Sequence, residues 1–207
     1  MLSVPMATAP VIDGTIGDGE WSGASSPWMF VDIASGNLAS RQPAVWLSRD
    51  DAALYVAASL PLPPGKKPVA AVTVRDGAVW EDDAFEVFLD PVCDGEYKQL
   101  IVNSVGNQWD SLRQDGSWNG EWTCAASVDR THWSLEMRIP FTDLGVEAPK
   151  PGDTWRANFA WDCKTPEASI ASWGHIKGAL HQPGCFGALT FAEGAPTVQV
   201  SGPVEFA

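Results

Sequence analysis

A carboxylate stands in the middle of an otherwise apolar segment, AFEVFLD at residues 84–90. Side chains alternate along an extended strand, so Phe85 and Val87 would share one face while Glu86 lies on the other. A charged group among apolar neighbours is costly unless a polar partner or a ligand satisfies it. Just upstream, Trp80 offers a large flat ring of the kind that stacks on a sugar. This combination is typical of a carbohydrate-binding sheet.

A second alternating segment, residues 97–103, places Gln99 and Asn103 on one face. The turn-rich connection at residues 90–96 predicts a hairpin between the two segments. Pairing them would bring Glu86, Gln99 and Asn103 to one surface, near the tryptophan. Three hydrogen-bonding side chains there predict a polyol site, and a solvated sheet face is the alternative.

The overall charge excludes some partners. Lys and Arg total 13 against 26 Asp and Glu, which gives a net charge of -13. No basic surface is available to neutralise phosphates, so neither nucleic acid nor an anionic membrane is expected as a partner. No segment approaches the roughly 18 apolar residues of a membrane span. Residues 1–10 lack the features of a signal peptide, yet the composition fits an extracellular or periplasmic protein.

The aromatic and cysteine residues leave alternatives open. There are eleven Trp and two Tyr, and four of the Trp lie in or beside polar, Gly-containing stretches: Trp80, Trp109, Trp118 and Trp122. The cysteines are widely spaced, at Cys93, Cys124, Cys163 and Cys185. Without a CxxC pair, zinc binding is not expected, and either one or two disulfides or four free thiols fit the sequence.

Short alternating strands separated by turn signals predict the fold class. Residues 44–49 and 53–60 form a hairpin pattern around Asp50 and Asp51. Two further segments, at residues 133–139 and 155–161, alternate between apolar and polar positions. No repeat or linker interrupts the pattern. We therefore predict an all-β protein with one domain over residues 1–207, an antiparallel β-sandwich of jelly-roll type with little helix.

Several short motifs also occur in a characteristic order. They are VIDG at 11–14, EW at 20–21, ALYV at 53–56, WEDDAFE at 80–86, VN at 102–103, IPF at 139–141, LG at 144–145, WRANF at 155–159, SW at 172–173 and, after Pro183, FG at 186–187. This order resembles the family 9 carbohydrate-binding modules and their wider sandwich superfamily, over about residues 10–192. The resemblance implies a carbohydrate ligand and, as partner, a catalytic domain of a glycan-degrading enzyme.

In sugar-binding members, the resemblance implies a slot between two Trp rings, bordered by a Glu and by amide and Arg side chains. Trp80 matches the first ring and Glu86 the carboxylate. Gln99 and Asn103 match two of the polar contacts. These four residues are the expected substrate-binding residues, with no catalytic residue among them.

Two positions depart from the pattern. Ile101 stands where an Arg is expected, and Leu180 where the second Trp is expected. His181 is adjacent, so we predict that it donates a hydrogen bond at the mouth of the site; the alternative is a loop histidine that caps the following turn. Trp118 or Trp122 could supply the missing wall.

Calcium is the cofactor that the superfamily often carries, bound by several oxygen ligands. Acidic residues near the strand ends are candidate ligands: Asp82, Asp83, Asp90 and Asp94. Their spacing matches no defined calcium loop, so solvated acidic loops are the alternative.

Three functions compete. The sequence favours a non-catalytic sugar-binding module. A structural or interaction domain with a degenerate site is the second. A glycan-active enzyme would need two carboxylates, such as Asp83 and Glu86, but these lie on opposite strand faces. Haem binding, a smaller branch, would need axial ligands such as Met29, Met137 or His181.

Overall fold

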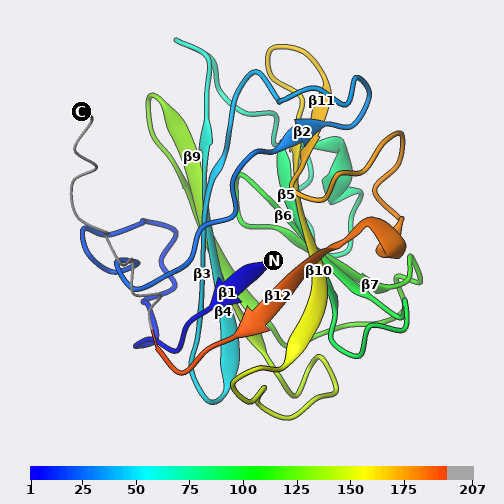
Figure 1. Ribbon diagram of the computed structural model, residues 1–207. Helices are drawn as coiled ribbons and strands as arrows, with labels where there is room; N and C mark the ends of the chain where they lie inside the picture. Colours follow the sequence, from blue (N-terminus) through cyan, green and yellow to red (C-terminus); the bar gives the residue numbers. More distant parts are fainter. Residues whose placement is uncertain (195–207) are drawn as a thin grey trace, which may run out of the picture.

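A computed structural model describes the structure of residues 1–194. Two sheets pack face to face (Figure 1). The larger sheet has the order β1-β12-β10-β5-β6-β7, and β11 joins β10 to β2 at its side. Its strands are β1 (Leu2–Val4), β2 (Val31–Asp32), β5 (Ala84–Asp90), β6 (Lys98–Asn103), β7 (Gln108–Leu112), β10 (Thr154–Cys163), β11 (Ser169–Ser172) and β12 (Gly187–Phe191).

The smaller sheet has the order β3-β4-β9-β8. Its strands are β3 (Ala44–Arg49), β4 (Ala53–Pro61), β8 (Thr123–Val128) and β9 (His132–Pro140). The helices in the described part of the chain are two short 3-10 turns, η1 (Val79–Glu81) and η2 (Pro183–Cys185). Within residues 1–194 the strands pair antiparallel except β1 with β12. The predicted antiparallel β-sandwich is confirmed.

The alternation read from the sequence sets the core. Phe85, Val87 and Leu89 of β5 point between the sheets, as do the apolar positions of β9 and β10. This leaves the other face of β5, with Glu86, on the outside of the larger sheet. Since one face of each strand is buried, the register is strongly constrained.

The register of the three central strands aligns their polar residues. Glu86 lies opposite Ile101 of β6 and Ala160 of β10. Gln99 lies opposite Phe88, and Asp162 lies opposite Ala84. Residues paired across strands point to the same side, so Glu86, Gln99 and Asp162 share the outer face of the larger sheet.

The N-terminal VIDG and EW motifs fix the first segment of the chain against the smaller sheet. The buried Glu136 carboxylate accepts hydrogen bonds from the Asp13 and Gly14 amides at 3.1 and 3.0 Å, and from Trp21 Nε1 at 3.0 Å. Gly14 has φ +85°, and a Cβ there would lie 2.7 Å from the Ala126 carbonyl carbon. Only glycine fits this close approach.

The ends of the domain and the cysteines complete the fold. β1 pairs with β12 and buries Val4 completely, so the sheet begins before residue 10, where the resemblance to the family starts. Residues 195–207 of the predicted 1–207 domain lie outside the described residues. All four cysteines are free thiols. Residues 1–194 contain no helix with the length and apolar character needed to span a bilayer.

Candidate functional site

A hollow of about 400 Å³ opens on the outer face of β5, β6 and β10. We call it the sheet-face pocket. The floor is polar and is formed from strand residues, and the walls are aromatic or come from loops. Its lining comprises Ile33, Trp80, Glu86, Gln99, Ile101, Trp109, Gln114, Asp162, Ile170, Gly178, Ala179, Leu180 and His181.

Two tryptophans form one wall. Trp80 projects from η1 with 41% of its surface exposed. Its ring meets the ring of Trp109 edge to face, with centroids 5.1 Å apart and planes at 78°. Trp109 lies on β7 opposite Ile101, which brings it to the face that carries Gln99. The wall is therefore a corner of two rings rather than a parallel slot.

The tryptophans considered as substitutes for the missing wall lie elsewhere. Trp122 is only 2% exposed, belongs to the core between the sheets, and donates from Nε1 to Asp110 Oδ2 at 2.6 Å. The hypothesis that it forms a pocket wall is wrong. Trp118 lies near Lys98, whose Nζ is 5.8 Å from the ring centroid, and is not among the pocket residues.

The structure brings Glu86 and Gln99 together on the floor, as the strand parity predicted. Gln99 Nε2 donates to Glu86 Oε2 at 2.6 Å, and both side chains are buried. Ser111 Oγ donates to Gln99 Oε1 at 3.4 Å and so helps to orient the amide. Glu86 is thus fixed in position and has acceptor capacity left.

Asp162 is a pocket residue that the sequence analysis did not select. It is 3% exposed, lines the same pocket as Glu86 and lies near enough to affect the pKa of Glu86. Burial raises the pKa of Glu86 well above its usual value, and the Asp162 charge raises it further. Burial also raises the pKa of Asp162, against the lowering effect of Lys164. Two carboxyls that interact in this way titrate as a pair, because ionising one disfavours ionising the other.

Asn103 is on the same face of the sheet but does not line the pocket. Its Nδ2 donates to Val72 O at 3.0 Å and to Asp82 Oδ2 at 2.9 Å, and its Oδ1 accepts from the Asn107 amide at 2.8 Å. These bonds use its donors and acceptor inside the protein. The structure therefore separates Asn103 from Glu86 and Gln99, with which the sequence grouped it.

The two aspartates beside Trp80 hold its loop. Asp82 accepts from the Ala71 and Val72 amides at 2.8 and 2.9 Å. Asp83 accepts from the Val69 and Lys164 amides and from Thr165 Oγ1, at 2.7, 2.9 and 3.0 Å. Neither lines the pocket, so Asp83 and Glu86 do not form a catalytic pair.

The remaining candidate calcium ligands also bond within the protein, and the candidate haem ligands lie in different parts of the fold. Asp90 accepts from the Asp94 and Gly95 amides. Across residues 1–194, no three His, Cys, Asp or Glu side chains are grouped so that they could hold a metal ion. Met137 is fully buried in the core between the sheets, whereas His181 lies at the outer-face pocket, so the two cannot ligate one haem.

His181 lies at the lip of the pocket beside the buried Leu180. Its Nδ1 is 2.8 Å from the Tyr97 hydroxyl, and the two rings are stacked with centroids 6.1 Å apart. Burial lowers the pKa of His181, which favours the neutral imidazole. Gln182 holds the adjacent loop, donating to the Lys177 and Ala179 carbonyls. With Nδ1 engaged, Nε2 is the ring nitrogen left for a ligand.

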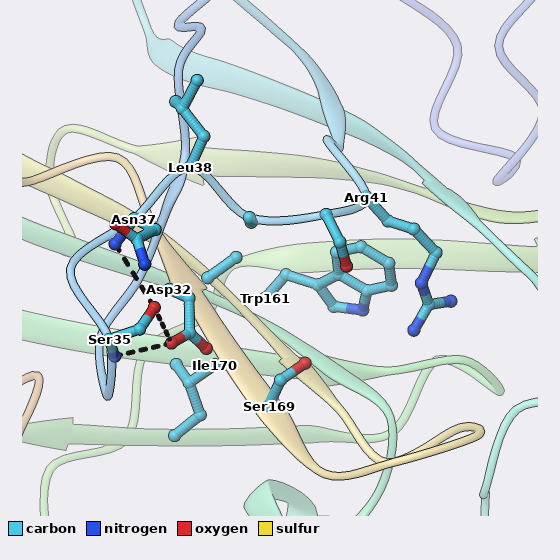
Figure 2. A pocket seen from close by; sticks show the side chains of 11 residues that line it. Asp32, Ser35, Asn37, Leu38, Arg41, Trp161, Ser169 and Ile170 are labelled. Carbon is cyan, nitrogen blue, oxygen red and sulfur yellow. Dashed lines mark hydrogen bonds between the residues drawn. The ribbon is translucent and has the colours of Figure 1, made fainter.

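A second hollow, of about 320 Å³, lies beside β11 (Figure 2). Asp32 there accepts from the amide and hydroxyl of Ser35, at 2.8 and 2.7 Å. The Arg41 guanidinium lies 5.0 Å from the Trp161 ring centroid and donates to the carbonyls of Pro61 and Thr165. The charged side chains of this second hollow, Asp32 and Arg41, are thus already bonded within the protein. The sheet-face pocket is therefore the better candidate site.

A β-sandwich with an aromatic-walled pocket on one sheet has the architecture of a ligand-binding module. The chain belongs to the family described as carbohydrate family 9 binding domain-like, whose model matches residues 12–193. The resemblance inferred from the motifs is therefore confirmed. Among curated proteins, no sequence matches significantly.

Solved structures share the fold. A family 9 carbohydrate-binding module from Caldicellulosiruptor kristjanssonii in complex with cellotriose is 20% identical, with TM-score 0.71 over 99% of this chain and 98% of that one. A family 9 module from the same organism in complex with glucose is 19% identical, with TM-score 0.70 over 97% and 98%. A candidate carbohydrate-binding protein from Bacteroides uniformis ATCC 8492 is 20% identical, with TM-score 0.72 over 92% and 98%.

Proposed function

We propose that this chain is a non-catalytic carbohydrate-binding module that holds one sugar residue, or a glycan end, in the sheet-face pocket. The observation that carries the proposal is the corner of Trp80 and Trp109 beside a floor of fixed hydrogen-bonding groups. The volume of about 400 Å³ lies within the range of small-ligand pockets. The family membership and the sugar-bound relatives support the same ligand class.

The polar contacts follow from the geometry of the floor. Sugar hydroxyls would donate to the free oxygens of Glu86 and Asp162 and, at the lip, interact with His181 Nε2. Hydrogen bonds to an ionised carboxylate are about twice as strong as neutral ones. The apolar face of the sugar ring would pack on the tryptophan corner. Asn103 has a supporting role in this proposal, because its side chain stabilises the loop before Trp80.

Carboxylate spacing supports the non-catalytic assignment. Glycosidases hold their two carboxyls about 5–9.5 Å apart, with the scissile bond between them. Glu86 and Asp162 instead lie together on the pocket floor and act on each other's pKa, rather than on opposite sides of a bound sugar. By analogy with the family, we expect the module to accompany a catalytic domain of a glycan-degrading enzyme, outside the cytoplasm.

An interaction domain with a degenerate site is the second candidate, because Leu180 offers no stacking ring on the loop side. Calorimetric titration with glucose, cello-oligosaccharides and xylo-oligosaccharides, backed by a glycan array, separates the two functions. We expect binding by the wild type and a loss of about tenfold or more in Trp109→Ala.

Trp28→Ala is the matched control, because Trp28 is 72% exposed and lies outside the pocket. It should bind like the wild type. Equal losses in both variants, or no binding to any glycan by the wild type, would contradict the proposed function.

A further inference from the structure

We propose that the sheet-face pocket selects a sugar that carries a primary ammonium group, such as a 2-amino-2-deoxyhexose, with Glu86 and Asp162 together as its counter-ion. The inference rests on the proposed function, since it names the ligand class of the same pocket. It begins with the charge of the lining. Two acidic side chains form the floor, and no Lys or Arg is among the residues that line the pocket.

The nearest bases do not balance this charge. Lys164 Nζ lies 3.9 Å from Asp162 Oδ2, at the limit of an ion pair, and is not a pocket residue. Asp83, beyond the floor, adds a further negative charge that acts on Asp162. His181 is the one titratable base that lines the pocket, and its burial favours the neutral ring. A cation entering the pocket would therefore meet two acidic side chains whose charge Lys164 only partly offsets.

The hydrogen-bond inventory leads to the same ligand. Gln99 donates to one oxygen of Glu86. Asp162 Oδ1 is buried and accepts from no N–H or hydroxyl of the described residues. An ammonium group has three N–H donors, enough to bond both carboxylates at once.

The aromatic walls are also compatible with a cation. The faces of Trp rings attract ammonium groups within about 6 Å, most strongly where water is excluded. Trp80 and Trp109 both line the pocket that holds the carboxyl pair. The wall that packs against a sugar ring thus also favours a positive charge on it.

Binding would be linked to proton release. Any proton that the pair holds in the free protein must leave to solvent when the ammonium binds, so that both carboxylates are ionised. The raised pKa values of Glu86 and Asp162 mean that the ammonium must compete with this proton. Affinity for an aminosugar should therefore rise with pH for as long as the ligand amine stays protonated.

The experiment is calorimetric titration of the wild-type chain with glucosamine, N-acetylglucosamine and glucose, and with short oligomers of each, at about pH 5 and about pH 6.5. N-acetylation removes the charge, so it isolates the ammonium. We expect glucosamine to bind about tenfold more tightly than N-acetylglucosamine at the higher pH, and the ratio to fall at the lower pH.

Asp162→Asn keeps the shape of the floor and removes the charge. It should abolish the preference for glucosamine over glucose and over N-acetylglucosamine; the wild-type comparison stands alone if the variant fails to fold. Equal or weaker binding of glucosamine relative to glucose would overturn the ammonium preference and leave the proposed function intact. Failure of every sugar to bind would instead refute the proposed function.

Discussion

The protein contains two pairs of neighbouring buried carboxylates. The two pairs differ in how many hydrogen bonds they accept from the protein. Asp82 and Asp83, beside Trp80, accept hydrogen bonds from backbone amides and side chains of surrounding loops. Glu86 and Asp162, on the pocket floor, receive one hydrogen bond from Gln99, and Lys164 Nζ lies 3.9 Å from Asp162 Oδ2. All four are at most 3% exposed. Burial of an acid therefore does not identify a binding site here, whereas its donor count does.

The difference assigns separate tasks to the two pairs. The saturated pair fixes the loop that presents Trp80, and its oxygens have little capacity left for a ligand. The unsaturated pair keeps buried acceptors that the protein does not satisfy, a cost that a ligand can offset. The same division separates Asn103, which is bonded to the loop, from Gln99, which orients Glu86.

The largest expected effect contrasts a supporting tryptophan with a pocket tryptophan. Trp155 is 4% exposed and packs edge to face on Phe141 and Phe191. Trp155→Ala should lower the free energy of unfolding by about 3–5 kcal/mol, as measured by urea denaturation. Trp80→Ala should cost much less stability and lose sugar affinity. Similar losses of stability in both variants would assign Trp80 to the core.

The next effect tests the carboxylates themselves with one chemical change at two positions. Asp83→Asn replaces an acceptor with an N–H group that faces protein donors, and should cost about 2–3 kcal/mol of stability. Asp162→Asn relieves a carboxylate repulsion and should change stability by less than about 1 kcal/mol or increase it. Chemical denaturation at neutral pH compares them. The comparison between the pairs fails if Asp162→Asn is the more destabilising.

The smallest effect is the pH dependence of stability. The ordinary pKa values of Glu86 and Asp162 are 4.5 and 3.8, and both are raised in the fold. Between those values and the raised ones, the folded state binds more protons than the unfolded state, so the pair's contribution to stability falls as pH rises. The double variant Glu86→Gln/Asp162→Asn removes this contribution.

Relative to the double variant, wild type should lose stability as the pH is raised from about 4 to about 7. Thermal unfolding across this interval provides the measurement, and the double variant cancels the contributions of all other titrating groups. If the stability of the two proteins changed with pH in parallel, the pKa values of Glu86 and Asp162 would not be raised in the folded state.

Strand periodicity was sufficient to predict much of the fold and to place Glu86 and Gln99 on the floor of the sheet-face pocket. Alternation correctly divided Phe85, Val87 and Leu89 from Glu86, and Leu100 and Val102 from Gln99, because one face of each strand is buried in the core. Trp109 was within reach of the same argument. Continuing the hairpin through the turn at Gly106 and Asn107 places it opposite Ile101.

Other features depend on contacts that no local pattern encodes. Parity put Asp162 on the polar face of its strand, but only the strand order sets β10 beside β5 and so brings Asp162 to Glu86. Asn103 bonds to Val72 and Asp82 because of the path of an irregular loop. The role of Trp122 was misjudged because its polar, glycine-containing surroundings conceal a ring packed in the core.

The central claim is that the sheet-face pocket binds a sugar through its unsatisfied carboxyl pair. A crystal structure of the protein with the tightest-binding sugar tests this most directly. We predict a sugar ring against Trp80 and Trp109, with an N–H or hydroxyl donor within about 3.2 Å of a carboxylate oxygen of Glu86 or Asp162. A sugar bound on another surface, such as the hollow beside Arg41 and Trp161, with no sugar donor on Glu86 or Asp162, would contradict the account.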